Sequence, residues 1–224
     1  ASGYMIKPFT GAELTEAVKT FTRIHTGGRS EVITFFSPKG KSGKTTLVSN
    51  LAVAMARKVN EPVAIIDADF QFGDQSVFLN LRPQSTITEA IRDIEFLSPV
   101  TLKPYFVKVS ENLHVLCGAS KPEQVDVVTI DKFTSLINMV KSLYGYVLID
   151  MPSGFSDITA TACELSTRTI LMTMYNGGYE VVHMRRALDI FRAWDDYEKR
   201  VELLFTWFRE RKIRKNSASL WDIR

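Results

Sequence analysis

Short apolar runs alternate along the chain with longer segments whose apolar residues recur at helical spacing. The apolar runs, which predict strands, lie at 32–36, 62–67, 113–117, 146–150, 169–174 and 201–208. The periodic segments, which predict helices, lie at 44–58, 86–95, 129–143, 157–165 and 179–198. Strands that are apolar throughout are buried on both faces, as in a parallel sheet covered by helices. The pattern therefore predicts a doubly wound α/β fold with a mostly parallel sheet, helices on both faces, and ligands at the carboxyl ends of the strands.

Composition narrows the class of protein. The chain has 224 residues, of which 45% are hydrophobic and 24% charged, which is ordinary for one soluble domain with a substantial core. Its formal charge of +3 is too small to indicate a polyanionic partner, although basic residues gather at 209–215. No apolar run approaches the roughly 18 residues of a membrane span. These features predict a cytoplasmic protein with no transmembrane segment.

The two cysteines, Cys117 and Cys163, are too few and too far apart for a disulfide framework or a zinc site. Neither has the spacing of an iron–sulfur ligand set, so we expect two buried apolar thiols in a reducing compartment. The histidines are scattered without the spacing of metal ligands.

The stretch "FFSPKGKSGKTTL", residues 35–47, joins a predicted strand to a predicted helix. Such a loop directs backbone N–H groups and the positive end of a helix dipole toward one point, which suits a bound polyphosphate. Gly43 allows close approach of the backbone, Lys44 can reach the β and γ phosphates, and Thr45 can place its hydroxyl on Mg²⁺. The usual GxxxxGK[ST] pattern fails, because Pro38 stands where its first glycine is required. A surface loop rich in glycine and lysine is the alternative interpretation.

Carboxylates follow two of the predicted strands. Asp67 and Asp69 come at the end of "PVAIIDAD", and Asp150 ends "YVLID". The carboxyl ends of parallel strands meet at the edge where the loop at 38–43 also emerges, so these side chains can face a bound phosphate. A role in turn formation is the alternative for Asp67.

The loop resembles the deviant phosphate-binding loop K-G-G-x-G-K-T-T of the ParA/MinD ATPase superfamily, through Lys39, Gly40, Gly43, Lys44, Thr45 and Thr46. The resemblance implies that nucleotide is bound by Lys39, Gly40, Lys41, Ser42, Gly43, Lys44, Thr45 and Thr46. It also implies that Lys39 reaches across a homodimer, with ATP sandwiched between the subunits, to the phosphates held by the partner. The sequence departs from the family at Lys41, where a glycine is usual. A side chain is tolerated there if the backbone angles are ordinary.

The stretch "DADFQFGD" is similar to the family's D-x-D segment, and "YGYVLIDMPSGF" resembles its Walker B strand and switch. The resemblance implies that Asp69 orients the attacking water. It implies a metal site formed by Thr45, Asp67 and Asp150, in which Asp150 binds Mg²⁺ through water. The implied activity is slow ATP hydrolysis with ATP and Mg²⁺ as cofactors. The catalytic residues implied are Lys39, Lys44 and Asp69.

Residues 1–30 resemble the last strand and helix of a response-regulator receiver domain, with a Lys-Pro pair at 7–8 and Thr10 as the helix N-cap. A generic amphipathic helix is the alternative. We expect 1–30 to be this remnant with its linker, and 31–224 to be the ATPase domain. This domain order, together with "SPKGKSGKTT" and "DADFQFGD", resembles the CpaE/TadZ branch, which acts in localising and assembling type IV (Flp/Tad) pilus machinery. It implies partners in pilus secretion or polar localisation, and recruitment to the cell pole or the inner membrane surface.

Two other functions stay open. A DNA-associated partition or cell-division positioning ATPase would use 209–215 for nonspecific phosphate contacts, although a solvated helix end explains the same residues. A scaffold that binds ATP and dimerises but hardly hydrolyses it is indicated by Lys41 and by the altered strand that would read the base. The strand end "TWF", residues 206–208, lacks the asparagine with which family members commonly read adenine. An aromatic residue there either stacks on the base or packs in the core.

Overall fold

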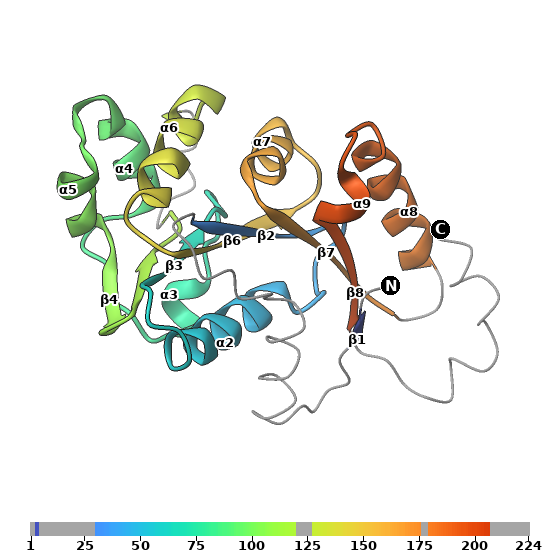
Figure 1. Cartoon of the computed structure of the whole chain (residues 1–224), viewed down its shortest axis with the longest axis horizontal. Helices are drawn as coiled ribbons and strands as arrows, with labels where there is room; N and C mark the ends of the chain where they lie inside the picture. Colours follow the sequence, from blue (N-terminus) through green and yellow to red (C-terminus); the bar gives the residue numbers. More distant parts are fainter. Residues whose placement is uncertain (1–2, 5–29, 120–126, 176–178, 207–224) are drawn as a thin grey trace.

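The computed structural model describes residues 3–4, 30–119, 127–175 and 179–206 (Figure 1). The predicted helix of the receiver-like segment, the basic cluster at 209–215, and Trp207 and Phe208 lie outside the described residues. The receiver-like origin of residues 1–30 and the domain division therefore stay predictions.

One eight-stranded sheet runs through the molecule in the order β1-β8-β7-β2-β6-β3-β5-β4. Its strands are β1 (Gly3–Tyr4), β2 (Glu31–Ser37), β3 (Val63–Asp67), β4 (Val107–Ser110), β5 (Leu113–Leu116), β6 (Tyr146–Ser153), β7 (Arg168–Met174) and β8 (Val201–Thr206). All pair in parallel except β4, which is antiparallel to β5. Because β6 lies between β2 and β3, the carboxyl ends of these three strands lie side by side.

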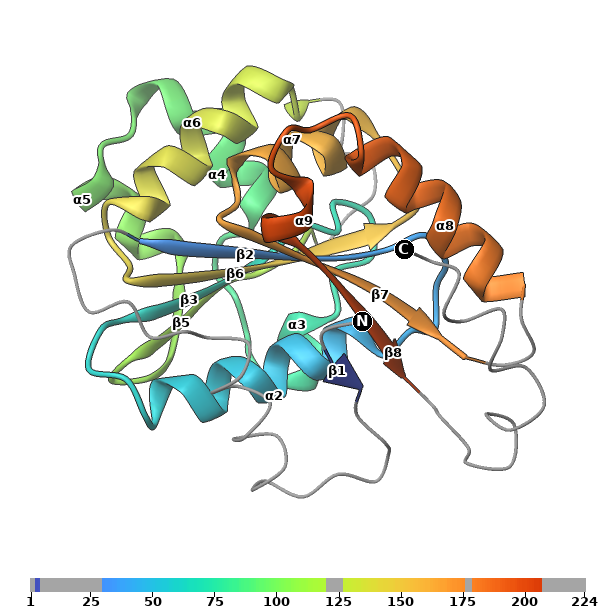
Figure 2. The same cartoon turned by 45° about the vertical axis from the view of Figure 1, so that its right-hand side comes forward.

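Helices cover both faces of the sheet, as predicted. They are α2 (Lys44–Ala56), α3 (Gln75–Phe78), α4 (Ile87–Asp93), α5 (Pro99–Leu102), α6 (Ile130–Lys141), α7 (Asp157–Leu165), α8 (Tyr179–Phe191) and α9 (Tyr197–Arg200), with the 3-10 turns η1 (Ile94–Phe96) and η2 (Lys103–Tyr105). Figures 1 and 2 show α2 and α3 on one face, and α4, α6, α7 and α8 on the other. None of the helices in the described ranges is both long and apolar enough to cross a bilayer.

The apolar stripes of the helices explain this arrangement. In α6, Phe133, Leu136, Ile137 and Val140 are fully buried and follow the i, i+3, i+4, i+7 spacing of one helix face. The helix begins where the Thr129 side chain accepts a hydrogen bond from the backbone N–H of Lys132 at 3.3 Å. On the other face of the sheet, α2 buries its own apolar residues against β2, β3 and β6. The sheet core therefore fixes where α2 begins, and with it the position of the phosphate-binding loop.

The structure differs from the predicted elements at the sheet edge and near the carboxyl terminus. Strand β4 was not predicted, because at the edge its apolar residues Val107 and Val109 are only partly buried and alternate with polar ones. The helix predicted over 179–198 is wrong as one element, since α8 ends at Phe191 and α9 begins at Tyr197. The break brings the Arg200 guanidinium to the end of α7, where it donates to three backbone carbonyls at 2.8 Å each.

The prediction of two buried thiols is confirmed. Cys117 and Cys163 are both buried and free of disulfide bonds. Burial raises the pKa of each thiol to about 12, so both stay protonated at neutral pH.

Candidate functional site

The loop between β2 and α2 ends in a helix N-terminus whose N–H groups have no side-chain cap. Gly43 is the N-cap residue of α2, with φ 79° and ψ 20°, in the left-handed region that favours glycine. No side chain caps the helix, and its first turn contains no acidic residue. At the start of the loop, the Ser37 hydroxyl donates to the Lys39 carbonyl at 2.6 Å. The N–H groups and the dipole of α2 can therefore bind an anion.

The backbone conformation at Lys41 differs from the one expected from the sequence. A side chain was expected to be tolerated at this position if the backbone angles were ordinary, but φ of Lys41 is 66°. In this left-handed region the Cβ of an L-residue approaches the following carbonyl oxygen, which costs about 1–2 kcal/mol. The loop therefore adopts the conformation that suits the family's glycine, with a lysine in its place.

We expect Lys41→Gly to raise the free energy of unfolding of the nucleotide-free protein by about 1 kcal/mol, because it removes this strain. Chemical denaturation measures the change. Lys39→Gly is the matched control, since Lys39 lies in the same loop and is not among the residues with positive φ. The control is expected to lose about 0.5 kcal/mol through added freedom of the unfolded chain. Equal losses in both variants would contradict the strain at Lys41.

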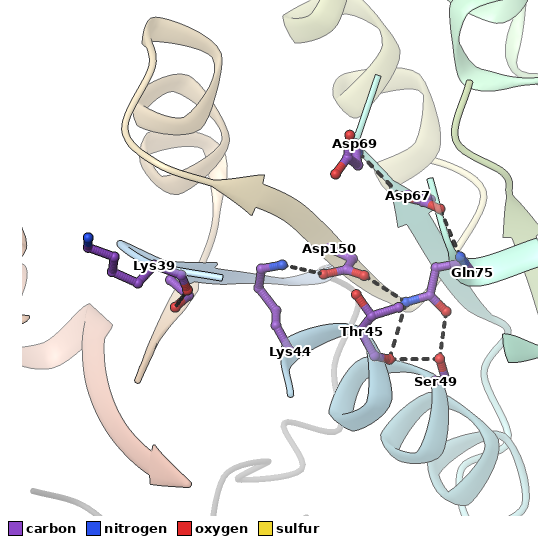
Figure 3. Close-up of polar contacts among 9 residues, drawn as sticks. Lys39, Lys44, Thr45, Ser49, Asp67, Asp69, Gln75 and Asp150 are labelled. Atoms are coloured by element: carbon purple, nitrogen blue, oxygen red, sulfur yellow. Dashed lines mark hydrogen bonds and ion pairs between the residues drawn. The ribbon is translucent and has the colours of Figure 1, made fainter. Parts of the chain in front are cut away.

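Lys44 and Asp150 form a buried ion pair beside this helix N-terminus (Figure 3). The Lys44 Nζ lies 3.2 Å from Asp150 Oδ1, and the two residues are 9% and 3% exposed. Oδ1 makes no aligned hydrogen bond, so the contact is electrostatic and leaves lone pairs of this oxygen open. The other oxygen, Oδ2, accepts an N–H from Gln75 Nε2 at 2.9 Å. The predicted phosphate-binding lysine is thus held by the predicted metal-binding aspartate.

Asp67 lies beside Asp150 on the neighbouring strand, since the two residues are paired in the β3–β6 register. Asp67 is 1% exposed, and its carboxylate accepts the backbone N–H of Asp69 at 3.3 Å and of Gln75 at 3.0 Å. Burial, and secondly the charge of Asp150, raise the pKa of Asp67 to about 7. The turn-forming role considered for Asp67 is therefore present in the structure, together with a carboxyl group that titrates near neutral pH.

Two glycines cover the Asp67 carboxylate. A Cβ at Gly73 would lie 2.5 Å from the Gly118 Cα and 2.7 Å from Asp67 Oδ2, and a Cβ at Gly118 would lie 2.6 Å from the Gly73 Cα and 2.9 Å from Asp67 Oδ2. The contact is between two backbones, so no flexible side chain can move away. Only glycine at both positions lets the loop after β3 pack against the end of β5.

Gly73→Ala is expected to destabilise the protein by about 3 kcal/mol or more, because the added methyl group overlaps backbone atoms. Thermal unfolding without nucleotide measures the loss. Gly40→Ala is the matched control, since its Cβ would meet nothing closer than Ser153 Oγ at 3.7 Å, an ordinary contact. A similar loss in the control would mean that the close packing at Gly73 is not the cause.

Asp69 and Lys39 lie farther from the ion pair. Asp69 is partly exposed, and its Oδ1 accepts the backbone N–H groups of Gln71 at 3.1 Å and Phe72 at 2.9 Å, which closes a turn of its own loop. Lys39 is exposed, and Figure 3 shows its amine pointing away from Lys44. The structure thus brings Lys44, Asp67 and Asp150 together and leaves these two residues at the margin of the site.

The residues present fit a magnesium ion held mainly by water and nucleotide. Within the described ranges no group of three His, Cys, Asp or Glu residues could hold a metal ion by itself. Both oxygens of Asp67 already accept backbone N–H groups, whereas Asp150 Oδ1 keeps open lone pairs. Mg²⁺ commonly keeps several waters and binds through one or two carboxylates plus substrate phosphates. Asp150 is therefore the carboxylate that can accept a metal-bound water, with Thr45 at the adjacent helix start.

Two further residues organise the site and were not identified from the sequence. Gln75 is fully buried, and its amide connects Asp150 to α2. Thr206, at the end of β8, donates its hydroxyl to the Ser42 carbonyl at 2.7 Å and so anchors the phosphate-binding loop. Neither belongs to a recognisable spacing, because both contacts join segments far apart in the sequence.

Three features of this site are typical of a P-loop nucleotide-binding protein. They are a loop with a left-handed glycine after a parallel strand, a lysine at the start of the next helix, and an aspartate opposite it at the end of another strand. The chain belongs to the family described as AAA domain (AAA_31), which matches residues 30–181. Its relatives place it in the ParA/MinD-type P-loop ATPase superfamily.

Proteins of known role and solved structures agree with this assignment. The septum site-determining protein MinD of Synechocystis is 29% identical over 146 residues, 64% of this chain and 53% of that protein. The chain spans about half the length of most of the curated relatives it matches, and 71% of the putative MinD of Guillardia theta. A ParA family ATPase from Chlorobium tepidum shares the fold with a TM-score of 0.77 and 17% identity, over 87% of this chain and 80% of that chain. MinD of Pyrococcus horikoshii, complexed with Mg-ADP, has a TM-score of 0.67 and 22% identity, over 87% and 77%.

Proposed function

We propose that the protein is an ATP-operated dimeric switch of the ParA/MinD type that hydrolyses ATP slowly. The observation that carries the proposal is the Lys44–Asp150 ion pair beside the uncapped N-terminus of α2. A cation, a carboxylate with an open oxygen and unpaired N–H groups converge there, which suits a triphosphate with its metal ion. The Mg-ADP named with the Pyrococcus horikoshii MinD supports this class of ligand.

Each residue has a role in this mechanism. Lys44 leaves Asp150 and binds the β and γ phosphates, while the N–H groups at the start of α2 surround them. Asp150 and Thr45 would hold the metal ion, and Asp67 would support Asp150 from the neighbouring strand. Mg²⁺, when bound, neutralises charge on the phosphates. Asp69 orients the attacking water.

Lys39 makes hydrolysis depend on a second subunit. Its exposed amine points away from the ion pair of its own site, which leaves it available to the phosphates bound by a partner (Figure 3). A second cation in a partly desolvated site stabilises charge that develops on the transferred phosphoryl group. Dimer formation and hydrolysis are therefore coupled through this lysine.

We further assign the switch to the positioning or assembly of type IV (Flp/Tad) pilus machinery, at the cell pole or the inner membrane surface. The resemblance of residues 1–30 to a receiver domain and of "DADFQFGD" to the CpaE/TadZ branch supports this assignment. A cell-division or DNA-partition role is the second candidate, which the name of the septum site-determining relatives favours. DNA binding that weakens steeply with salt would support the partition role.

The test is the molar mass in solution with ADP, with ATP and Mg²⁺, and with ATP and Mg²⁺ for Lys39→Ala, together with phosphate release. We expect the wild-type protein to be a dimer with ATP and Mg²⁺ but not with ADP. Lys39→Ala should lose that dimer and release phosphate about a hundredfold more slowly. Lys58→Ala, at an exposed lysine beyond the end of α2, is the control and should dimerise normally. A monomer in every state that still hydrolyses ATP would contradict the dimeric switch.

A further inference from the structure

Gln75, the first residue of α3, has no assigned role in this mechanism, yet it is fully buried at its centre. Its side chain contacts Asp150 on β6 and Ser49 on α2, and its backbone N–H contacts Asp67 on β3 (Figure 3). The side-chain nitrogen also lies 3.5 Å from the Thr45 carbonyl. One residue thus joins the three elements that carry the predicted metal site.

The chemistry of its partners fixes the orientation of the Gln75 amide. An ionised carboxylate only accepts hydrogen bonds, so the group 2.9 Å from Asp150 Oδ2 must be the Nε2 donor. The Oε1 then accepts the Ser49 hydroxyl at 2.7 Å, and Ser49 also lies 2.7 Å from the Thr45 carbonyl. The amide is therefore a directed connection, with its donor end on the metal-binding aspartate.

A chain of hydrogen bonds leads from Asp150 through Gln75 to the loop that carries Asp69. The Gln75 side chain donates to Asp150, the Gln75 backbone N–H donates to Asp67 Oδ2 at 3.0 Å, and the Asp69 N–H donates to Asp67 Oδ1 at 3.3 Å. Asp69 in turn accepts the N–H groups of Gln71 and Phe72. These bonds form a continuous connection between the Asp150 carboxylate and the backbone at 69–72.

We propose that Gln75 is a positioning residue that transmits the binding of a divalent cation at Asp150 to the loop bearing Asp69. The inference rests on the proposed function and deepens it. When Asp150 exchanges the Lys44 amine for a metal-bound water, its Oδ2 carries the Gln75 amide with it. The start of α3 and the turn at Asp69 follow, and the hydrogen bonds that already close this turn open less often when the cation is present.

Hydrogen exchange of the backbone amides at 69–72 tests this, in the full chain without nucleotide, with ADP, and with ADP and Mg²⁺. In the wild-type protein, adding Mg²⁺ to the ADP complex is expected to slow exchange about tenfold or more, the effect of a hydrogen bond to a charged group. Gln75→Met keeps the length of the side chain but lacks the donor. It should bind ADP without Mg²⁺ within about twofold of wild type and lose the Mg²⁺-dependent slowing.

Two more variants separate transmission from packing. Gln75→Asn keeps a polar amide and the backbone bond to Asp67 but withdraws the donor by one methylene, and it should behave like Gln75→Met. Ser49→Ala removes the other partner of the same amide and should retain the slowing. Full slowing in both Gln75 variants, or equal loss in Ser49→Ala, overturns the proposal. A wild-type protein that binds ADP without any Mg²⁺-dependent slowing overturns it while leaving the proposed function intact, whereas failure to bind ADP removes both.

Discussion

Lys44→Ala is expected to abolish nucleotide binding and, in addition, to destabilise the protein that has no nucleotide bound. The second effect follows from the buried pair, because the Asp150 carboxyl group would stay in a nearly inaccessible position without its cation. Breaking such a pair costs about 3–5 kcal/mol, and Gln75 still donates to the carboxylate, so we expect about 3 kcal/mol. For a domain of this size the melting temperature falls by about 10 °C. Differential scanning calorimetry and a fluorescent-nucleotide titration measure the two effects.

The ion pair can be separated from simple loss of the side chain. In an Asp150→Asn background the buried charge is absent, so adding Lys44→Ala should cost less than about 1 kcal/mol. Asparagine still offers an oxygen to the Gln75 amide. An equal cost of Lys44→Ala in both backgrounds would show that the stability comes from packing of the lysine stem and not from its charge.

Asp67 is expected to make the nucleotide-free protein less stable as pH rises. Its pKa is raised from 3.8 to about 7 in the folded protein, mainly by burial. Its contribution to stability is therefore fully present below about pH 4 and is lost as pH rises through 7. At about 1.36 kcal/mol for each pKa unit, the loss between pH 5 and pH 8 is about 3 kcal/mol. Urea denaturation of wild type and Asp67→Asn at both pH values measures it.

Asp67→Asn also loses one acceptor for a backbone N–H, but this cost does not change with pH. The free energy of unfolding of the variant, relative to that of the wild-type protein, should therefore rise by about 3 kcal/mol between pH 5 and pH 8. Asp93→Asn is the control, because the side-chain hydrogen bonds from Arg92 and Tyr105 lower the pKa of Asp93, which leaves it ionised throughout this range. If the difference in the free energy of unfolding between wild type and Asp67→Asn did not change with pH, the Asp67 carboxyl group would ionise at its ordinary pH.

The order of strands and helices was predictable because burial on both faces of a parallel sheet leaves uninterrupted apolar runs. Each run that predicted a strand contains one within the described residues, namely β2, β3, β5, β6, β7 and β8. Edge strand β4 lacks such a run, since only alternate residues face the core. Helix α3 is four residues long, less than the two turns needed to show a helical period.

The candidate site was predictable as far as it depends on strand ends. Lys44, Asp67 and Asp150 could be placed together because they follow parallel strands at one edge of the sheet. The role of Gln75 could not, since it depends on how the loop at 68–74 folds back over Asp67. That path requires the backbone contact between Gly73 and Gly118, which joins residues with no pattern in common.

The hydrogen bond from Thr206 to the Ser42 carbonyl determines which end of a peptide dipole a bound anion would meet. In a trans peptide the carbonyl and the following N–H point in opposite directions. Because the Ser42 oxygen is directed to Thr206, the N–H of Gly43 points away from β8. A rotated peptide would present oxygen, with its negative partial charge, where the loop now presents hydrogen. The polarity of the loop is thus set by a hydroxyl group 164 positions away in the sequence.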